Sequence, residues 1–158
     1  MPQAAYRCGH CLREQPVLDG VVAAVDYGQP WSRLVAQMKF HGQPRLAQVL
    51  AGRLVEAIRA APATPGAVDL PSLVLPVPMT DARLGERGYN QAWELARRVA
   101  GGLSLPSDAG LLLRLHDAPN QVGLDRRSRI ANLQGVFAVE PRRRARLHGA
   151  TVAVIDDV

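Results

Sequence analysis

The residues best suited to chemistry are two adjacent carboxylates, Asp156 and Asp157, which directly follow the apolar run 151–155. That run has the composition of a buried strand, and charges at the end of a buried strand are costly unless they have a task or a partner. Because the backbone turns beyond a strand's end, both carboxylates can face one crevice. There they could accept hydrogen bonds from a pair of ribose hydroxyls, with or without a divalent metal ion nearby. The alternative is a solvated acidic turn after an edge strand.

A second candidate site follows the apolar run 73–77. Prolines on either side of Val77 stiffen the exit of this predicted strand, and an irregular loop there would offer backbone N–H groups to an anionic oxygen. The loop residues are Val77, Pro78, Met79 and Thr80. Arg83 and Arg87 come next and, being four residues apart, share one face of a helix. The alternative is an ordinary strand-to-helix connection with two solvent-facing arginines.

The two cysteines, Cys8 and Cys11, form one Cys-x-x-Cys pair. Structural zinc takes four protein ligands, so the pair could supply half of a zinc site that His41 or a second chain would have to complete. Either a first pair lies upstream of Met1, or the protein has lost the metal. A redox role fits less well, because a redox Cys-x-x-Cys follows a strand and opens a long helix. Cys8 and Cys11 are therefore candidate zinc ligands.

Positive charge is concentrated in one part of the chain. Of 19 cationic residues all but Lys39 are arginine, and the formal net charge is +5 at pH 7. Segment 114–146 holds eight arginines against three carboxylates, so it carries the whole excess. Arginine's rigid fork matches phosphate geometry, which makes the segment a candidate site for nucleic acid or a phosphorylated small molecule. The candidate nucleic-acid contacts are Arg126, Arg127, Arg129, Arg142, Arg143 and Arg144. The alternative is a solvated surface in a chain that prefers arginine to lysine.

Composition excludes several classes of protein. With 158 residues, of which 47% are hydrophobic and 21% charged, the chain is neither disordered nor collagen-like. It contains no uninterrupted apolar run of about 18 residues, so we expect no transmembrane helix. The N-terminus lacks a basic segment followed by an apolar one, so we expect no secretory signal. Two cysteines are too few for a disulfide scaffold, which favours a cytoplasmic location.

Hydrophobic patterning predicts the elements that position these residues. Short apolar runs predict strands at 21–25, 73–77, 136–139 and 151–155, and helical spacing predicts helices at 30–42, 44–60, 90–99 and 124–133, with a surface loop at 61–71. We expect Asn90 to cap the third helix and Gly101-Gly102 to end it. Strands alternating with helices predict an α/β domain over residues 19–158, with a largely parallel sheet flanked by helices and a separate element at 1–18. Such sheets bind ligands at the carboxyl ends of their strands, here 76–80 and 156–157.

Several sequence blocks together resemble the ComF/GntX family. They are LPVP at 75–78, RLGERGYNQA at 83–92, QVGLDRR at 121–127 with Arg129, and NL and GVF at 132–133 and 135–137. MKFHG at 38–42 and VIDDV at 154–158 also fit. The blocks follow the family's order over nearly the whole chain from Cys8 onward. The resemblance implies a type I phosphoribosyltransferase-like fold, preceded by a short element like half of a zinc ribbon.

The resemblance also implies roles for the candidate residues. In that superfamily an Asp-Asp pair binds the ribose hydroxyls of phosphoribosyl pyrophosphate (PRPP), often near Mg²⁺, which assigns this role to Asp156 and Asp157. The loop 77–80 would grip the pyrophosphate, and Arg83 and Arg87 would add anion contacts. Catalysis would be electrostatic and positional, with cations stabilising the departing pyrophosphate while a nucleophile is held in line. The family is linked to natural competence and DNA uptake, which implies single-stranded DNA and competence proteins as partners.

Two features of the sequence depart from the family pattern. Past the acidic pair, the family continues into a Thr-Thr-Gly-like loop that opens a helix and holds the 5′-phosphate, whereas this sequence stops at Val158. We therefore expect the polypeptide as given to be truncated at the PRPP-binding loop and not to be a competent transferase. At the N-terminus, family members often have two Cys-x-x-Cys pairs, of which this sequence has one.

Three functions are compatible with these observations. The first is a PRPP-dependent phosphoribosyltransferase whose acceptor is unassigned. The second is a non-catalytic module that contacts DNA or partner proteins through the arginine-rich segment 114–146, since a fold can keep a ligand pocket and gain a partner surface. The third is a structural α/β domain, in which changing Asp156 and Asp157 would affect local stability only.

Overall fold

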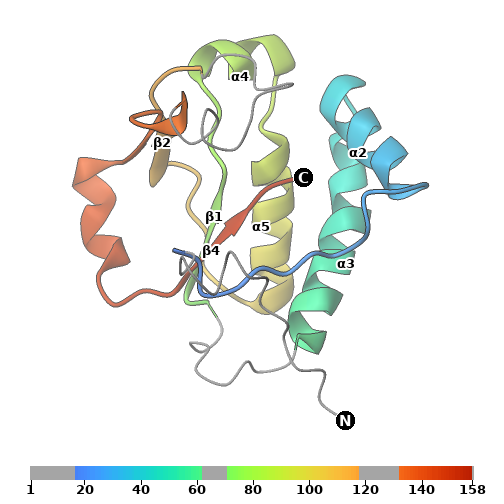
Figure 1. Cartoon of the computed structure of the whole chain (residues 1–158), viewed down its shortest axis with the longest axis horizontal. Helices are drawn as coiled ribbons and strands as arrows, with labels where there is room; N and C mark the ends of the chain where they lie inside the picture. Colours follow the sequence, from blue (N-terminus) through green and yellow to red (C-terminus); the bar gives the residue numbers. More distant parts are fainter. Residues whose placement is uncertain (1–16, 62–70, 118–131, 158) are drawn as a thin grey trace.

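The computed structural model describes residues 17–61, 71–117 and 132–157. Its helices are α2 (Trp31–Phe40), α3 (Ala47–Ala60), α4 (Asp81–Arg87) and α5 (Gln91–Leu103), with 3₁₀ helices η1 (Pro44–Leu46) and η2 (Pro141–Leu147). Its strands are β1 (Leu73–Pro76), β2 (Leu112–Arg114), β3 (Phe137–Val139) and β4 (Val152–Ile155). Figure 1 shows α2 and α3 on one side, α5 and the β1/β4 pair in the middle, and η2 on the opposite side. The expected mixed α/β architecture is confirmed for these residues.

The strands form two separate pairs. β1 and β4 run parallel with Leu73 opposite Val152 and Pro76 opposite Ile155, whereas β2 and β3 are antiparallel. On its other side β1 meets the chain that follows α5, through a parallel bridge from Val74 to Ser107. Among the described residues the parallel sheet is therefore small, and the largely parallel sheet expected from the sequence is limited to the β1/β4 pair and this bridge.

The alternation of side chains along β1 divides the core in two, because successive residues of a strand point to opposite faces. Val74 packs with α3 and α5 in one cluster that also holds Met38 and Ile155. Leu73 and Leu75 pack on the other face, in a cluster completed by residues of β2, β3, η2 and β4. All four residues of β1 are buried, as the unbroken apolar run predicts for a strand covered on both faces.

The two glycines of helix α5 do not have the role expected from the sequence. Gly101 and Gly102 do not end the helix, which continues to Leu103 and is capped by Ser104 in the left-handed conformation, at φ 57°. A Cβ atom on Gly102 would lie 2.8 Å from Cγ2 of Val55 on α3, which is too close for any real contact. The glycine therefore permits α5 and α3 to approach each other, and its effect is on packing rather than on helix length.

The other element predictions have mixed outcomes. The helices expected at 30–42 and 44–60 and the strands expected at 136–139 and 151–155 are confirmed with slightly shorter bounds. The strand expected at 21–25 is wrong: this stretch pairs with no other strand in the described residues, and Val21 is 81% exposed. An apolar run forms a strand only where another strand satisfies its backbone groups. The loop at 61–71, apart from its ends, and the helix expected at 124–133, apart from Asn132 and Leu133, lie outside the described residues.

The membrane expectation can be checked against the helices themselves. In the three described stretches, none of the helices combines the length and the apolar character that crossing a membrane requires.

Candidate functional site

The candidate site lies where β1 and β4 end. Because the two strands are parallel and Pro76 lies opposite Ile155, both chains leave the sheet at the same edge. The backbone N–H of Val77 donates to the carbonyl of Ile155 at 2.9 Å, so the pairing extends one residue beyond the strands. The loop 77–80 and the acidic pair, each expected from the sequence at the carboxyl end of a strand, therefore begin side by side.

The two carboxylates of the acidic pair have different surroundings. The side chain of Asp157 is only 3% exposed, and Nζ of Lys39, from the last turn of α2, lies 3.1 Å from its Oδ2 and 3.4 Å from its Oδ1. Asp156 is exposed to solvent in part, and its Oδ1 accepts the backbone N–H of Asp157 at 2.9 Å. One carboxylate is thus held inside by an ammonium group, while the other remains available at the surface.

The pKa of Asp156 is raised to about 6. The largest cause is desolvation by the surrounding protein, which disfavours the charged form; the hydrogen bond from the Asp157 backbone opposes it, and the neighbouring Asp157 charge adds to it. The positive charge of Lys39 lowers the pKa by a smaller amount. A ligand that brings a positive charge or a hydroxyl donor to Asp156 would stabilise the charged form of this carboxyl.

The loop 77–80 is fixed at both ends. The side-chain amide of Asn90, at the start of α5, donates to the carbonyl of Val77 at 3.0 Å, while its Oδ1 accepts the N–H groups of Ala92 and Trp93 and so caps the helix. At the other end, the hydroxyl of Thr80 caps α4. The loop offers fewer free backbone N–H groups than the sequence suggests, because Pro78 has no N–H and the N–H of Val77 donates to the carbonyl of Ile155. Met79 and Thr80 remain to supply N–H groups.

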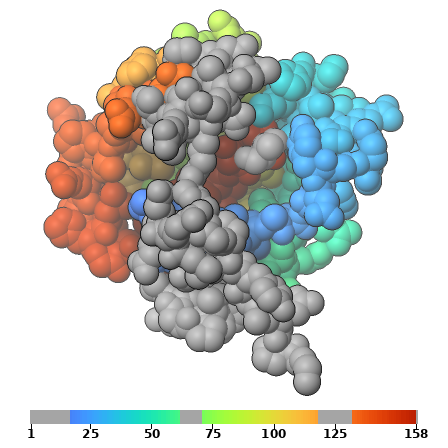
Figure 2. Space-filling model, viewed as in Figure 1, coloured from blue at the N-terminus to red at the C-terminus, as the bar shows by residue number. Residues whose placement is uncertain are grey.

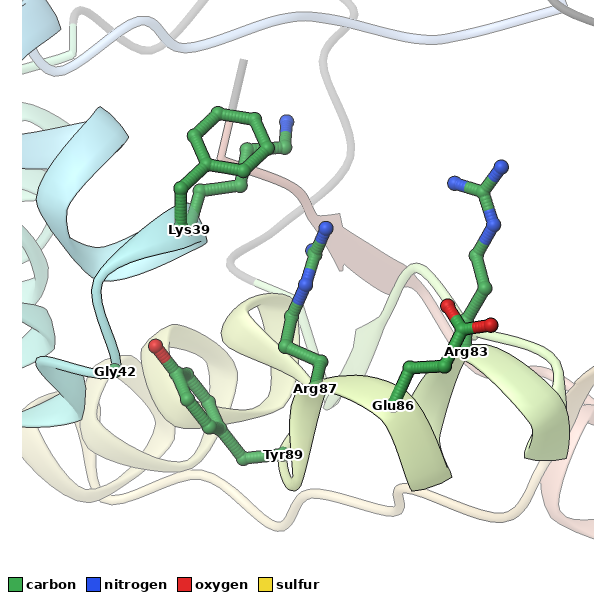
Figure 3. Close-up of a pocket in the computed structure, with 7 residues that line it drawn as sticks. Lys39, Gly42, Arg83, Glu86, Arg87 and Tyr89 are labelled. Carbon is green, nitrogen blue, oxygen red and sulfur yellow. The ribbon is translucent and has the colours of Figure 1, made fainter.

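A cleft of about 370 Å³ opens beside this edge. It is lined by Lys39, Phe40 and Gly42 from the end of α2, and by Arg83, Glu86, Arg87 and Tyr89 from α4 and the turn after it. Figure 3 shows the side chains of Lys39, Arg83 and Arg87 extending in the same direction from these two helices. Three cations and one carboxylate therefore surround one space, here called the cationic cleft.

The cations of the cleft differ in their partners. Lys39 is paired with Asp157, and Nε of Arg83 lies 3.1 Å from Oδ1 of Asp117, whose Oδ2 also accepts the Thr80 hydroxyl at 3.2 Å. Among the described residues, Arg87 contacts an amide and an aromatic ring: it donates to Oε1 of Gln91 at 2.8 Å and lies over the ring of Phe40 at 5.8 Å. Arg87 therefore has the charge least neutralised by these contacts.

Comparison with known proteins identifies the family. The chain is 33% identical over 160 residues to "Competence protein F" of Haemophilus influenzae, which covers 98% of this chain and 66% of that protein. It is 31% identical to "DNA utilization protein YhgH" of Salmonella typhimurium and 30% identical to the protein of the same name from Escherichia coli K12, in each case over 96% of this chain and 64% of the relative. The chain belongs to the ComF family.

The ComF chain spans about two thirds of the length of these curated relatives. No family model matches it, and no solved structure matches it.

The arginine-rich segment of this ComF chain is divided by the structure. Arg142, Arg143 and Arg144 lie on η2, and all three are exposed. Nη1 of Arg143 lies 2.6 Å from Oδ1 of Asp108, and Arg146 pairs with the other oxygen of this carboxylate, whose side chain is 4% exposed. Arg143 therefore attaches η2 to the chain beside β1, whereas Arg142 and Arg144 project to solvent. The other candidate contacts, Arg126, Arg127 and Arg129, lie outside the described residues, as do Cys8 and Cys11.

Two residues of the cationic cleft escaped the sequence reasoning. Lys39 contacts the acidic pair and lines the cleft, and the Tyr89 hydroxyl donates to the carbonyl of Met38, which fixes the end of α2 next to α4. A signal for Lys39 was present, because it is the sole lysine of the chain and lies in the MKFHG block at 38–42. Only the packing of α2 against the sheet edge shows what it contacts.

The Mg²⁺ that the ComF resemblance implies can be tested against the residues present. Carboxylate oxygens are the right donors, but no cluster of three or more metal-binding side chains occurs in the parts of the chain that the structure describes. Oδ2 of Asp157 is buried and, among the described residues, faces the Lys39 ammonium at 3.1 Å without a hydrogen bond of good geometry, so a cation is already compensating this oxygen. Mg²⁺ commonly keeps several waters and binds through one or two carboxylates plus substrate phosphates, and the acidic pair fits that mode.

Proposed function

We propose that this ComF-family chain forms part of a binding site for a phosphoribosyl ligand of the PRPP type, in a protein that serves DNA utilisation or competence. The biological role follows the names of the relatives, "Competence protein F" and "DNA utilization protein YhgH". The ligand class rests on the residues at the sheet edge. In this proposal the whole domain adopts the type I phosphoribosyltransferase-like arrangement that the sequence blocks resemble.

One observation carries the proposal. The parallel register of β1 and β4 brings an acidic pair suited to ribose hydroxyls to the same edge as a loop and a cleft suited to phosphate. Ligands of α/β sheets bind at this edge. A molecule with adjacent hydroxyls and several phosphate oxygens could therefore contact both charge types at once.

Each group at the edge has a role in such a site. Asp156 and Asp157 would accept hydrogen bonds from the ribose hydroxyls and hold Mg²⁺, which supplies charge neutralisation to the pyrophosphate when bound. The N–H groups of Met79 and Thr80 would donate to a pyrophosphate oxygen. Arg83 and Arg87 would stabilise the negative charge that grows on pyrophosphate as it departs, so that catalysis, if an acceptor is present, is positional and electrostatic.

The test is calorimetric titration of the product of the complete reading frame with PRPP in the presence of MgCl₂. We expect saturable binding that an excess of pyrophosphate weakens, and we expect Asp156→Asn with Asp157→Asn to abolish it. Ribose 5-phosphate is the matched control ligand, since it lacks the pyrophosphate and should bind more weakly. Equal affinity for PRPP in the doubly substituted protein would exclude the acidic pair as the ribose site.

A second candidate function is a DNA-binding surface on η2, favoured by the exposure of Arg142 and Arg144. Replacing both by glutamine should weaken binding of single-stranded DNA and reduce its salt dependence, because fewer counterions are released. Arg143 is unsuitable for this test, since it pairs with Asp108 and its replacement would also remove that buried ion pair. Unchanged affinity and an unchanged salt slope would remove this candidate.

A further inference from the structure

Lys39 belongs to both halves of the candidate site. Its ammonium pairs with Asp157, and its side chain also lines the cationic cleft beside Arg87. The end of α2 that presents it is held in place by the hydrogen bond from Tyr89 to Met38. A single side chain thus contacts the group that would bind ribose and also lines the space beside the groups that would bind phosphate.

On the side of the acidic pair, Lys39 acts as a resident counter-cation. The Asp157 side chain is 3% exposed, and a buried carboxylate is stable only when a nearby charge compensates it. The ammonium lies next to both carboxylate oxygens, 3.1 Å from Oδ2 and 3.4 Å from Oδ1, and among the described residues Oδ2 is buried without a hydrogen bond of good geometry. Any ligand of Asp157 must therefore compete with the ammonium group.

On the side of the cleft, Lys39 is free enough to change partners. Its side chain is 29% exposed, and lysine is a point charge on a flexible four-carbon stem, unlike the planar fork of arginine. In Figure 2 the dark red surface of the C-terminal segment is recessed beside the blue surface that includes α2. An anion bound next to Arg83 and Arg87 would offer Lys39 a second negative partner.

We propose that Lys39 exchanges partners when a phosphorylated ligand binds. In the free protein it neutralises Asp157; in the bound protein it contacts a phosphate oxygen in the cationic cleft and leaves Asp157 to a ribose hydroxyl or a divalent cation. The ligand class rests on the proposed function, while the exchange itself rests on the double position of Lys39. The exchange couples the two halves of the site, so that an anion in the cleft increases the cation affinity of Asp157, and the reverse.

The experiment measures cation and anion binding separately. Mn²⁺ is the cation probe, because it shares the oxygen preference of Mg²⁺ and its free concentration is visible by electron paramagnetic resonance. Pyrophosphate without metal is the anion probe, followed by calorimetry. Lys39→Met should bind Mn²⁺ about tenfold more tightly than the unmodified protein, because the competing charge is gone, and pyrophosphate about fivefold more weakly.

Two control variants separate this exchange from a general change in charge. Arg33→Met removes one charge from the exposed face of the same helix, and both affinities should stay within about twofold of those of the unmodified protein. Arg87→Met removes a cation of the cleft that is not paired with Asp157, so pyrophosphate binding should weaken while Mn²⁺ binding changes little. If Mn²⁺ affinity in Lys39→Met is unchanged or weaker, Lys39 is not the competitor and the proposal is overturned.

A second variant tests the exchange from the other partner. Asp157→Asn releases Lys39 from its ion pair, so pyrophosphate should bind several-fold more tightly and Mn²⁺ more weakly. A fold defect would weaken both, and circular dichroism detects it. Weaker pyrophosphate binding by an Asp157→Asn protein whose circular dichroism spectrum is unchanged would overturn the proposal even if Lys39→Met failed to fold. If Mn²⁺ and pyrophosphate affinities change in opposite directions in each variant but PRPP does not bind, the exchange is retained and PRPP is rejected as the ligand.

Discussion

Two cationic regions of this ComF chain can be compared directly, because they lie on opposite sides of the β1/β4 pair (Figure 1). The arginine segment on η2 has the higher density of charge in the sequence, whereas the cationic cleft has three cations drawn from two helices. On η2, two arginines are paired with the buried Asp108, and Arg142 and Arg144 are exposed to solvent. In the cleft, the cations surround a space of about 370 Å³ at the carboxyl edge of the sheet.

The difference shows that a count of charges does not locate an anion site. Arginines that compensate a buried carboxylate stabilise the fold and have less charge left for a ligand. Cations from separate elements that surround one cleft can act on one ligand together. We therefore expect substitutions on η2 to change mainly the stability of the fold, and substitutions in the cationic cleft to change mainly the binding of anions.

The largest expected effect is on the η2 side. Asp108→Ala removes the buried carboxylate that holds Arg143 and Arg146, and it also removes the acceptor for the backbone N–H of Gly110. Because both arginines are about half exposed and can return to water, we expect a loss of about 2–3 kcal/mol of unfolding free energy. Urea denaturation followed by circular dichroism measures it. A loss below about 0.5 kcal/mol, the level of an ordinary surface substitution, would show that η2 is held by other contacts.

The next effect separates the two regions by anion binding. Arg87→Gln should weaken pyrophosphate binding about tenfold, because the arginine is the cleft cation with the weakest internal neutralisation. Arg142→Gln is the matched control on η2 and should leave the affinity within about twofold. Calorimetric titration of both variants measures the contrast. Equal weakening would mean that the anion is bound by the general field of the protein, and the comparison of regions would fail.

A smaller effect is expected for the residue that connects α2 to the turn after α4. Tyr89→Phe removes the hydrogen bond to the carbonyl of Met38 while keeping the ring, so it should cost about 1 kcal/mol of stability. Because that carbonyl precedes Lys39, pyrophosphate binding should also weaken, by about two- to threefold. Thermal denaturation and calorimetry check the two parts. Loss of stability without loss of affinity would separate Tyr89 from the positioning of Lys39.

The smallest effect is a pH dependence at the sheet edge. The pKa of Asp156 in the folded protein is about 6, above the value of about 3.9 for an unperturbed aspartate. The folded state then holds the proton more strongly, so the unfolding free energy should fall as the pH rises from about 4 to about 6. Asp156→Asn should remove this part of the pH profile. The effect should be small, because Asp156 is partly exposed to water. If the unfolding free energy rises over the same pH interval relative to that of Asp156→Asn, the raised pKa is contradicted.

Much of the local structure was predictable from the sequence. The helix that Asn90 begins, the buried run at β1 and the strand before the acidic pair follow from capping chemistry and apolar patterning. The errors have a common cause. An isolated run such as 21–25 is a strand only with a partner, and Gly102 stops a helix only if no neighbouring helix needs the space that its missing Cβ leaves. Both conditions concern residues far away in the sequence.

The candidate site likewise depends partly on the sequence and partly on contacts between residues far apart in the chain. The sequence by itself determined the chemistry available, namely the acidic pair, the proline-bounded loop, Arg83 and Arg87, because residue types and their order fix which groups leave the ends of which strands. Only the tertiary structure decided how these groups are used. Lys39 and Asp157 are 118 positions apart and meet only because α2 packs beside the edge of the β1/β4 pair. Arg143 and Arg144 are neighbours, yet one pairs with Asp108 and the other faces solvent, because three-dimensional packing alone places a buried carboxylate near one of them.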